Sequence, residues 1–416
     1  MSSADGTQRI LTLDIVRGVA VMGILAMNIV GFGLPFQSYF NPAAYGALST
    51  ADLVSWTASF VFVDGKMRGL FSFLFGASIL LVIQRADAKG ESPASVHYRR
   101  MLWLLVFGLL HFYLIWFGDI LTGYAVIGMV AYLFRNKPVR TLVAWGGGLL
   151  VFQLLIMTAL SASMILLERQ AQAPGASAET VRQWQNMART FGPLDAAQVD
   201  KTLALFRGGW LDLVRHRLFT QTAKPLGGIV MGGPETLAYM LFGMAALKSG
   251  FLTGAWDDRT YRRVLLIGFG VGIPAYLLIG WAYYRSGFAV PMTFAYGMAA
   301  TVPFRPLMIL AIAASIILLT RSGGPLVGRI AAAGRAAFTN YLGTSILMTT
   351  LFYGYGFGLF GTLGRAELWL VVLAAWALML AWSKPWLDRF AYGPFEWLWR
   401  TLARGRVQPL RRPVPA

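Results

Sequence analysis

Residues 10–35, ILTLDIVRGVAVMGILAMNIVGFGLP, form an apolar run that decides the fold. A helix that spans a bilayer takes about 20 apolar residues, so this run is long enough to cross once. Its polar residues Asp14, Arg17 and Asn28 fall within roughly 60° of one helix face over about 21 Å. Because charged side chains inside a bilayer usually face protein or a cavity, this face predicts a buried polar seam that other helices cover. For Asp14 and Arg17 alone, pairing at the membrane edge is the alternative.

The composition of the whole chain is that of a polytopic membrane protein. Of its 416 residues 57% are hydrophobic and only 13% are charged, whereas a soluble domain has about 25% charged residues. Apolar runs of spanning length lie at about 11–34, 66–84, 101–117, 119–134, 141–167, 226–247, 264–284, 294–320, 336–356 and 367–384. The sequence therefore predicts an all-α transmembrane bundle of about ten helices.

The charges indicate the orientation of this bundle. There are 36 Lys and Arg residues against 18 Asp and Glu, a net charge of +18, and the basic residues gather in alternate short loops. By the positive-inside rule these loops are cytoplasmic, and so are both termini. Since the basic residues lie between apolar runs, we attribute the charge to topology and anionic lipid, and exclude nucleic acid as a partner. The chain has no Cys and three His, so we predict no metal site.

We divide the chain into four segments by composition. They are an amino-terminal transmembrane bundle (1–167), an extracytoplasmic helical insert (168–225), a carboxy-terminal transmembrane bundle (226–390) and a basic cytoplasmic tail (391–416). Gly and Pro pairs divide the insert into helices at about 178–190, 195–207 and 210–219. The third has Trp210, Leu211, Val214 and Leu218 on one face, which fits an interfacial helix or a solvated helix packed on the bundle. Residues 51–63 fit either a half-helix or part of a long second span.

A histidine and a carboxylate suggest acid–base chemistry in the outer half of the bundle. His111 lies on the third span, and Asp119 at the turn into the fourth. A His with a carboxylate in reach is the minimum for a general base at neutral pH, although a His hydrogen-bonded between helices is the alternative. Lys66 and Arg68 begin the second span and would be either snorkelling residues or an anchor for an anionic group. We expect these four residues and Asn28 at similar depth.

Two further spans carry charges next to prolines. Glu235 follows Gly232-Gly233-Pro234 on the sixth span, and Arg305 lies between Pro303 and Pro306 on the eighth. We predict that both helices are broken within the membrane, as in many substrate or ion pathways. A buried Glu235–Arg305 salt bridge explains the same residues, and we favour it.

Polar residues near the carboxyl end complete the candidate site. Residues 334–345 (GRAAFTNYLGTS) contain Asn340 and Tyr341, and 392–400 (YGPFEWLWR) contain Glu396 and Arg400. We expect them near the level of Asp14 and Arg17, with helix capping and an aromatic interfacial belt as the structural alternatives. The predicted substrate-binding residues are Asp14, Arg17, Lys66, Arg68, Tyr124, Glu235, Arg305, Asn340 and Tyr341.

Six motifs, in order along the chain, carry a family resemblance. They are LDIVRGVAVMGILAMN, KMRGLFSFLFGAS, GLLHFYLIWFGDILTGYAVIG, GRAAFTNYLGTSI, FYGYGFGLFG and YGPFEWLWR. Together they resemble the YeiB-like family of bacterial inner-membrane proteins, known as domain of unknown function 418. The resemblance implies a multi-pass protein of the bacterial inner membrane.

At its amino end this family is similar to transmembrane acyltransferases such as heparan-α-glucosaminide N-acetyltransferase. Those enzymes move an acetyl group from cytosolic acetyl-CoA to a sugar amine across the membrane, with an Asp-x-x-Arg-Gly stretch, an Asn and a His in the active region. Asp14, Arg17, Gly18 and Asn28 match the first two features. The family His lies in the loop after the first span, where this chain has Tyr39 and Asn41, and its nearest substitute is His111.

The resemblance and the residues together favour a membrane-bound acyltransferase. Acyl-CoA would be the donor, bound at a basic cytoplasmic mouth near Arg17, Arg335 and Arg400, and an envelope sugar or lipid would be the acceptor. In this scheme the catalytic residues are His111, Asp119 and Asn28. His111 is the general base, Asp119 orients its ring, and Asn28 donates a hydrogen bond to the oxyanion or to the acceptor.

The alternative is a transporter or exporter of a small anionic or amphipathic solute, with Glu235 as a proton site. The lipid bilayer is a partner in both cases, and a homodimer is left open.

Overall fold

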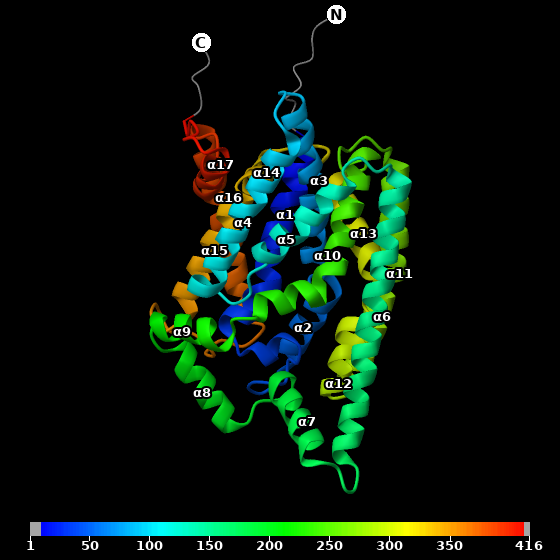
Figure 1. The fold of residues 1–416 in the computed structure, drawn as a ribbon, viewed down its shortest axis with the longest axis vertical. Coiled ribbons are helices and arrows are strands. Elements are labelled where there is room, and N and C mark those ends of the chain that lie inside the picture. Colours follow the sequence, from blue (N-terminus) through cyan, green and yellow to red (C-terminus); the bar gives the residue numbers. More distant parts are fainter. Residues whose placement is uncertain (1–9, 412–416) are drawn as a thin grey trace, which may run out of the picture.

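The fold is an all-helical bundle organised around its first helix (Figure 1). The computed structural model describes residues 10–411, so the predicted cytoplasmic ends at 1–9 and 412–416 lie outside the described residues. Helix α1 (Leu11–Gly33) has 19 of its 23 residues buried, because α3, α14, α15 and α16 pack around it. The predicted polar seam is therefore covered by other helices.

The elements of the amino-terminal half connect through short turns and one long loop. In chain order they are α1, η1 (Phe36–Tyr39), α2 (Thr50–Phe62), α3 (Lys66–Asp87), α4 (Pro93–Leu110), η2 (His111–Ile115), α5 (Leu121–Ala131), η3 (Tyr132–Phe134), α6 (Val139–Gln172), α7 (Ala178–Phe191), α8 (Ala196–Phe206) and α9 (Trp210–Thr220). Here α7, α8 and α9 fall at the predicted insert helices. They lie at the end of the bundle opposite to both termini (Figure 1).

The carboxy-terminal half returns along the same axis. Its elements are α10 (Lys224–Lys248), α11 (Asp258–Arg285), α12 (Val290–Met292), η4 (Thr293–Ala299), α13 (Arg305–Thr320), α14 (Pro325–Arg335), α15 (Ala337–Phe352), α16 (Leu368–Arg389) and α17 (Pro394–Arg404). Both ends of the described chain come to the same end of the bundle (Figure 1).

The all-α transmembrane prediction is confirmed in outline. Within the described residues, seven helical stretches are long and apolar enough to cross a membrane, and the shorter apolar helices Leu121–Phe134 and Arg305–Thr320 accompany them. The interruption predicted in the eighth span is present, since η4 ends at Ala299 and α13 begins at Arg305.

The break predicted in the sixth span is wrong, because α10 continues through Pro234. A proline removes one backbone hydrogen bond, which packing can offset. Here α3, α5 and α6 pack along α10.

The apolar segment before the second span is a separate half-helix. A capping box between Ser49 and Asp52 starts α2, and the chain turns at Gly65 before α3 begins. Gly65 has φ 72°, a left-handed conformation that side chains rarely adopt. This glycine also leaves room for Arg305, since a Cβ at Gly65 would lie 2.6 Å from its Nε atom.

Close contact between α1 and α14 closes the inner end of the seam. A Cβ at Gly334 would lie 1.9 Å from the Asp14 carbonyl oxygen, and one at Gly18 would lie 2.1 Å from the Ile330 carbonyl oxygen. Small residues let two helix backbones approach this closely in a membrane. The Gly18 of the Asp-x-x-Arg-Gly stretch therefore has a packing role.

Helix α9 leaves most of its predicted apolar face exposed. It buries Leu213, Val214 and Arg217, whereas Leu211 and Phe219 are 57% and 83% exposed. The Arg217 guanidinium donates to the Tyr113 carbonyl oxygen at 3.2 Å, so contact with η2 sets the buried face.

Candidate functional site

A hydrogen-bonded histidine–aspartate pair lies where α4 gives way to the π-helical turn η2. His111 Nδ1 is 2.9 Å from Asp119 Oδ1, and both side chains are 1% exposed. Asp119 also accepts hydrogen bonds from the backbone N–H groups of Leu121 at 3.1 Å and Thr122 at 2.8 Å. These two backbone groups begin α5 and hold the Asp119 carboxyl group in place beside His111. An imidazole that donates from Nδ1 to Asp119 leaves Nε2 as an acceptor.

The other imidazole nitrogen is free to react. His111 Nε2 is buried and has no hydrogen-bond partner among residues 10–411. The ring packs against Tyr341 and Trp116, with centroids 5.2 Å and 6.4 Å away, and Trp116 stacks on Phe32 of α1 at 3.9 Å. Buried polar atoms without partners are uncommon, and π-helical turns are frequent at functional sites. Both features single out His111 as a candidate reactive group.

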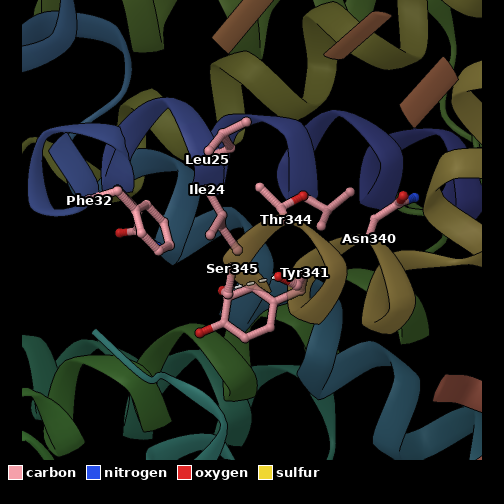
Figure 2. A pocket seen from close by; sticks show the side chains of 9 residues that line it. Ile24, Leu25, Phe32, Asn340, Tyr341, Thr344 and Ser345 are labelled. Atoms are coloured by element: carbon pink, nitrogen blue, oxygen red, sulfur yellow. Dashed lines mark hydrogen bonds between the residues drawn. The ribbon is translucent and has the colours of Figure 1, made fainter. Parts of the chain in front are cut away.

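A small polar cavity lies next to this pair, between α1 and α15. It has room for about one water molecule. Its lining residues are Val21, Ile24, Leu25, Asn28, Phe32, Asn340, Tyr341, Thr344 and Ser345. Figure 2 shows Tyr341, Thr344 and Ser345 on one side of the cavity and Ile24 and Leu25 on the other.

The cavity follows the face of α1 that the sequence singled out. Val21, Leu25 and Asn28 continue the stripe of Asp14 and Arg17, since all lie on one side of the helix at 100° per residue. From Arg17 to Asn28 the seam extends about 16 Å. The cavity lies along this face of α1, beginning at Val21.

At the inner end Arg17 bridges two helices. Its Nη1 donates to Asp14 Oδ1 at 3.1 Å, and its Nη2 donates to Ser78 Oγ on α3 at 2.9 Å. The Arg17 side chain is 23% exposed. Asp14 and Arg17 therefore pair, as the alternative for these two residues predicted, and Arg17 Nη2 also contacts Ser78 on α3.

A second charged cluster, which we call the Glu235 cluster, joins α3, α10 and α13. Glu235 is 3% exposed and accepts hydrogen bonds from Arg68 Nη2 at 2.6 Å, from Tyr239 Oη at 2.9 Å and from Arg305 Nη1. Arg305 Nη2 also donates to Thr301 Oγ1 at 2.6 Å. The predicted Glu235–Arg305 ion pair therefore forms, with Arg68 as a second guanidinium partner.

Lys66 is enclosed and does not snorkel to a surface. Its side chain is fully buried, with Nζ donating to the Phe60 carbonyl oxygen and lying 3.2 Å from the centroid of the Tyr276 ring. A cation over an aromatic face recovers part of the cost of desolvation. Within residues 10–411 no hydrogen bond or ion pair joins Lys66 to His111 or Asp119, so these residues do not form one site.

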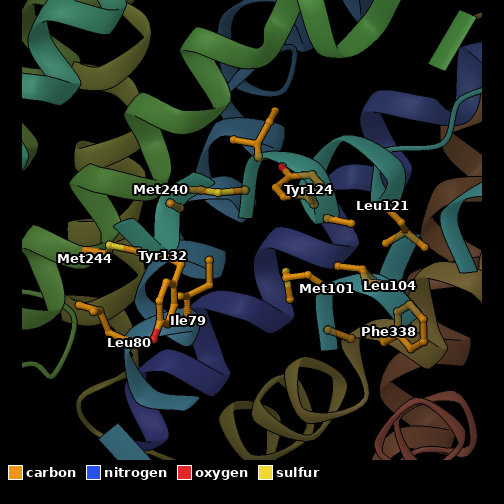
Figure 3. Close-up of a cluster of buried hydrophobic side chains, with 14 of the residues drawn as sticks. Ile79, Leu80, Met101, Leu104, Leu121, Tyr124, Tyr132, Met240, Met244 and Phe338 are labelled. Atoms are coloured by element: carbon orange, nitrogen blue, oxygen red, sulfur yellow. The ribbon is translucent and has the colours of Figure 1, made fainter. Parts of the chain in front are cut away.

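Tyr124 joins α5 to the first turns of α3. Its hydroxyl donates to the Arg68 carbonyl oxygen at 3.0 Å and is 2.6 Å from Ser72 Oγ. Figure 3 shows Tyr124 among the buried apolar side chains of α3, α4, α5 and α10, with Leu121 and Met240 nearby. These contacts give Tyr124 a structural role beside Arg68.

Asn340 lies near the level of Asp14, since it bonds Ala333 and the next residue, Gly334, contacts the Asp14 backbone. Asn340 donates to Ala333 O at 3.0 Å and Ser383 Oγ at 3.2 Å and accepts from Trp382 Nε1 at 2.9 Å, so its amide is engaged in holding α14, α15 and α16 together. The ring of the next residue, Tyr341, packs on His111.

Several polar residues of these clusters escaped the sequence analysis. They are Ser72, Ser78, Tyr239, Thr344 and Ser345. Ser345 follows Tyr341 by four residues and so shares its helix face, a signal that was available in the quoted motif. Tyr239 follows Glu235 by four residues and carries the same signal, whereas Ser78 bonds Arg17, 61 positions away, with nothing local to mark it. Within the described part of the chain no three His, Asp or Glu side chains converge as a metal site would require.

Comparison of the sequence with known proteins identifies the family that the chain is similar to. The family described as "Protein of unknown function (DUF418)" matches residues 246–406. The chain is 32% identical over 418 residues to "Uncharacterized protein YeiB" of Escherichia coli (strain K12), covering 97% of this chain and 98% of that protein. It is 30% identical over 441 residues to "Uncharacterized protein YxaH" of Bacillus subtilis (strain 168), covering 99% of each. A 39.9 kDa protein of Bacillus acidopullulyticus is 27% identical over 404 residues, covering 97% of this chain and 96% of that protein.

Proposed function

The chain belongs to the YeiB-like DUF418 family, and from that premise and the geometry around His111 we propose that it is an integral membrane acyltransferase. It moves an acyl group, such as acetyl, from acyl-CoA to an envelope sugar or lipid. The observation that carries this proposal is the buried His111–Asp119 pair, whose Nε2 has no hydrogen-bond partner within residues 10–411 and whose ring packs on Tyr341 of the cavity lining. The resemblance of the amino-terminal stretch to transmembrane acyltransferases supports it.

The proposed reaction uses His111 twice. Nε2 takes the proton from the acceptor hydroxyl or amine as that atom attacks the thioester carbonyl carbon. The carbon–sulfur bond then breaks, and the leaving thiolate receives the proton from the imidazolium. Asp119 stabilises the imidazolium through Nδ1–H, and the Asn28 amide donates a hydrogen bond to the carbonyl oxygen while it carries negative charge.

The seam suggests how the two substrates meet. Acyl-CoA binds at the end of the bundle that holds the termini, which the loop charges make cytoplasmic in an N-in, C-in bacterial inner-membrane protein. Its pantetheine arm follows the seam from Arg17 toward Asn28, a length of about 16 Å. Because apolar residues such as Leu25 fill the seam, α15 has to move away from α1 to admit the donor.

The Glu235 cluster favours a second candidate, a transporter or exporter of a small anionic or amphipathic solute. Charged side chains within membrane-spanning helices commonly mark solute or proton pathways. In this alternative Glu235 exchanges a proton, and the seam is the solute path.

A combined transfer and binding assay tests the acyltransferase proposal. Purified protein is incubated with labelled acetyl-CoA and host envelope extract, and CoA release and acylated product are followed. His111→Gln should lower transfer by about 10²- to 10⁴-fold while leaving CoA affinity nearly unchanged, because a general base acts on rate. His216→Gln, the same change on α9 outside the site, is the control.

The donor end is tested separately with Arg17→Lys. An ammonium cannot replace the guanidinium fork that reaches both Asp14 and Ser78, so CoA affinity should fall first. Calorimetry that detects no CoA binding to the wild type, or full transfer by His111→Gln, would overturn the acyltransferase assignment. A carrier would instead show His111 variants with altered solute uptake in proteoliposomes.

A further inference from the structure

A cluster of arginines lies where α17 docks against α4, at the end of the bundle that holds both termini (Figure 1). We call it the arginine cluster; its members are Arg85, Arg99, Arg100, Arg400 and Arg404. The guanidinium carbon of Arg100 lies 4.4 Å from the ring centroid of Trp399, whose Nε1 donates to the Arg100 carbonyl oxygen at 3.0 Å. These contacts fix the centre of the cluster between the two helices.

The cluster holds more positive than negative charge. Among ion pairs within residues 10–411, one reaches it, from Arg404 to Glu91 at 3.9 Å, with both side chains more than a third exposed. Burial lowers the pKa of Arg400; the neighbouring Tyr392 and Glu396 act to raise it, and Arg404 and Arg85 act to lower it. Since like charges at this spacing repel each other, the arrangement is favoured when an anion lies among them.

An apolar stripe on α4 leads directly to the cluster. Leu102, Val106 and Leu110 are 54%, 42% and 49% exposed, and they share one face of the helix. Arg99 lies three residues before Leu102 on that same face, and its Nη2 is 3.0 Å from where a Cβ on Gly405 would be. An acyl chain along this stripe would therefore bring its headgroup to Arg99 and its neighbours.

We propose that the arginine cluster binds the phosphate of an anionic phospholipid in the adjacent leaflet. Guanidinium groups suit this role, because their planar forks bind phosphate oxygens in pairs and remain charged when partly buried. The stripe selects a lipid over a water-soluble phosphate compound, which would gain nothing from exposed leucines. This site is separate from His111, and it gives Arg400, which was expected from the sequence at the donor mouth, a lipid ligand instead.

Native mass spectrometry of the full-length protein with phosphatidylglycerol tests the proposal. The double variant Arg100→Gln/Arg400→Gln should bind this lipid about thirtyfold more weakly, since each arginine near a charged surface contributes roughly fivefold. The matched control is Arg135→Gln, because Arg135 also stacks on an aromatic ring, at 4.0 Å from Tyr132, but lies outside the cluster. It should bind like the wild type, and phosphatidylcholine should show no difference among the three proteins.

Two further arms separate the alternatives. If pyrophosphate or CoA binds in phosphatidylcholine nanodiscs and the double variant abolishes this binding, the site belongs to a soluble phosphate compound and the lipid assignment fails. Equal losses in the double variant and in Arg135→Gln would also overturn it, because general charge would then explain the binding. Should the double variant unfold, Arg99→Gln replaces it in the same assay, since this exposed side chain lies at the end of the stripe.

Discussion

Replacing Glu235 by Gln tests how strongly the buried ion pairs of the Glu235 cluster stabilise the fold. This carboxylate is 3% exposed and faces the guanidinium groups of Arg68 and Arg305. Without its charge, Arg305 remains buried with no other salt bridge among residues 10–411, and the new amide N–H group of Gln points at groups that are themselves donors. Removing one partner of a buried ion pair costs about 3–5 kcal/mol, and we expect this loss in the free energy of unfolding.

The free energy of unfolding is measured by titrating purified protein from mild detergent into SDS and following helicity by circular dichroism. Glu179→Gln is the control, since that carboxylate is 58% exposed and its loss should have no measurable effect. The double variant Glu235→Gln/Arg305→Met should recover part of the loss, because it removes the stranded charge and leaves Arg68, whose side chain is 25% exposed. If Glu235→Gln unfolds within about 1 kcal/mol of the wild type, as for an exposed pair, the buried coupling described above is refuted.

Two further substitutions test packing and protonation. Gly334→Ala should lower the melting temperature in detergent, because its Cβ would lie 1.9 Å from the Asp14 carbonyl oxygen. Gly328→Ala on the same helix is the control, since a Cβ there meets open space and should leave the melting temperature unchanged. Equal melting temperatures of the two variants would argue against the close α1–α14 contact. Burial raises the pKa of Glu396 in the folded protein above its ordinary value of about 4.3 in the unfolded chain. The bound proton therefore stabilises the fold fully below about pH 4.3, and this stabilisation is lost as the pH rises through the folded-state pKa. The melting temperature of the wild type relative to Glu396→Gln should therefore fall from about pH 4 upward, and a rise would contradict the direction of the shift.

The sequence allowed the helical class and the polar stripe of α1 to be predicted, because both depend on local periodicity. His111 and Asp119 were also accessible, since eight positions separate them across one turn and a contact between them requires no knowledge of distant packing. The burial of Lys66 could not be foreseen. Its ammonium group lies on the ring of Tyr276, a residue of α11 more than two hundred positions away.

Where the prediction failed, tertiary packing outweighed a local signal. Pro234 reads as a helix break, but neighbouring helices hold α10 continuous around it. This effect has no trace in the residues next to Pro234.

The docking of α17 has a consequence for how the protein is made. Glu396 accepts hydrogen bonds from the backbone N–H groups of Phe338 at 2.7 Å and Thr339 at 3.1 Å, which are the first turn of α15. These donors are synthesised well before their acceptor, and at about 5–20 residues per second they wait several seconds for it. Helix α15 also carries Tyr341, which packs on His111. A chain that is truncated before residue 396 would therefore contain all of the spans, but its α15 would lack the amino-terminal cap. Membrane quality control would then recognise the defect at this helix.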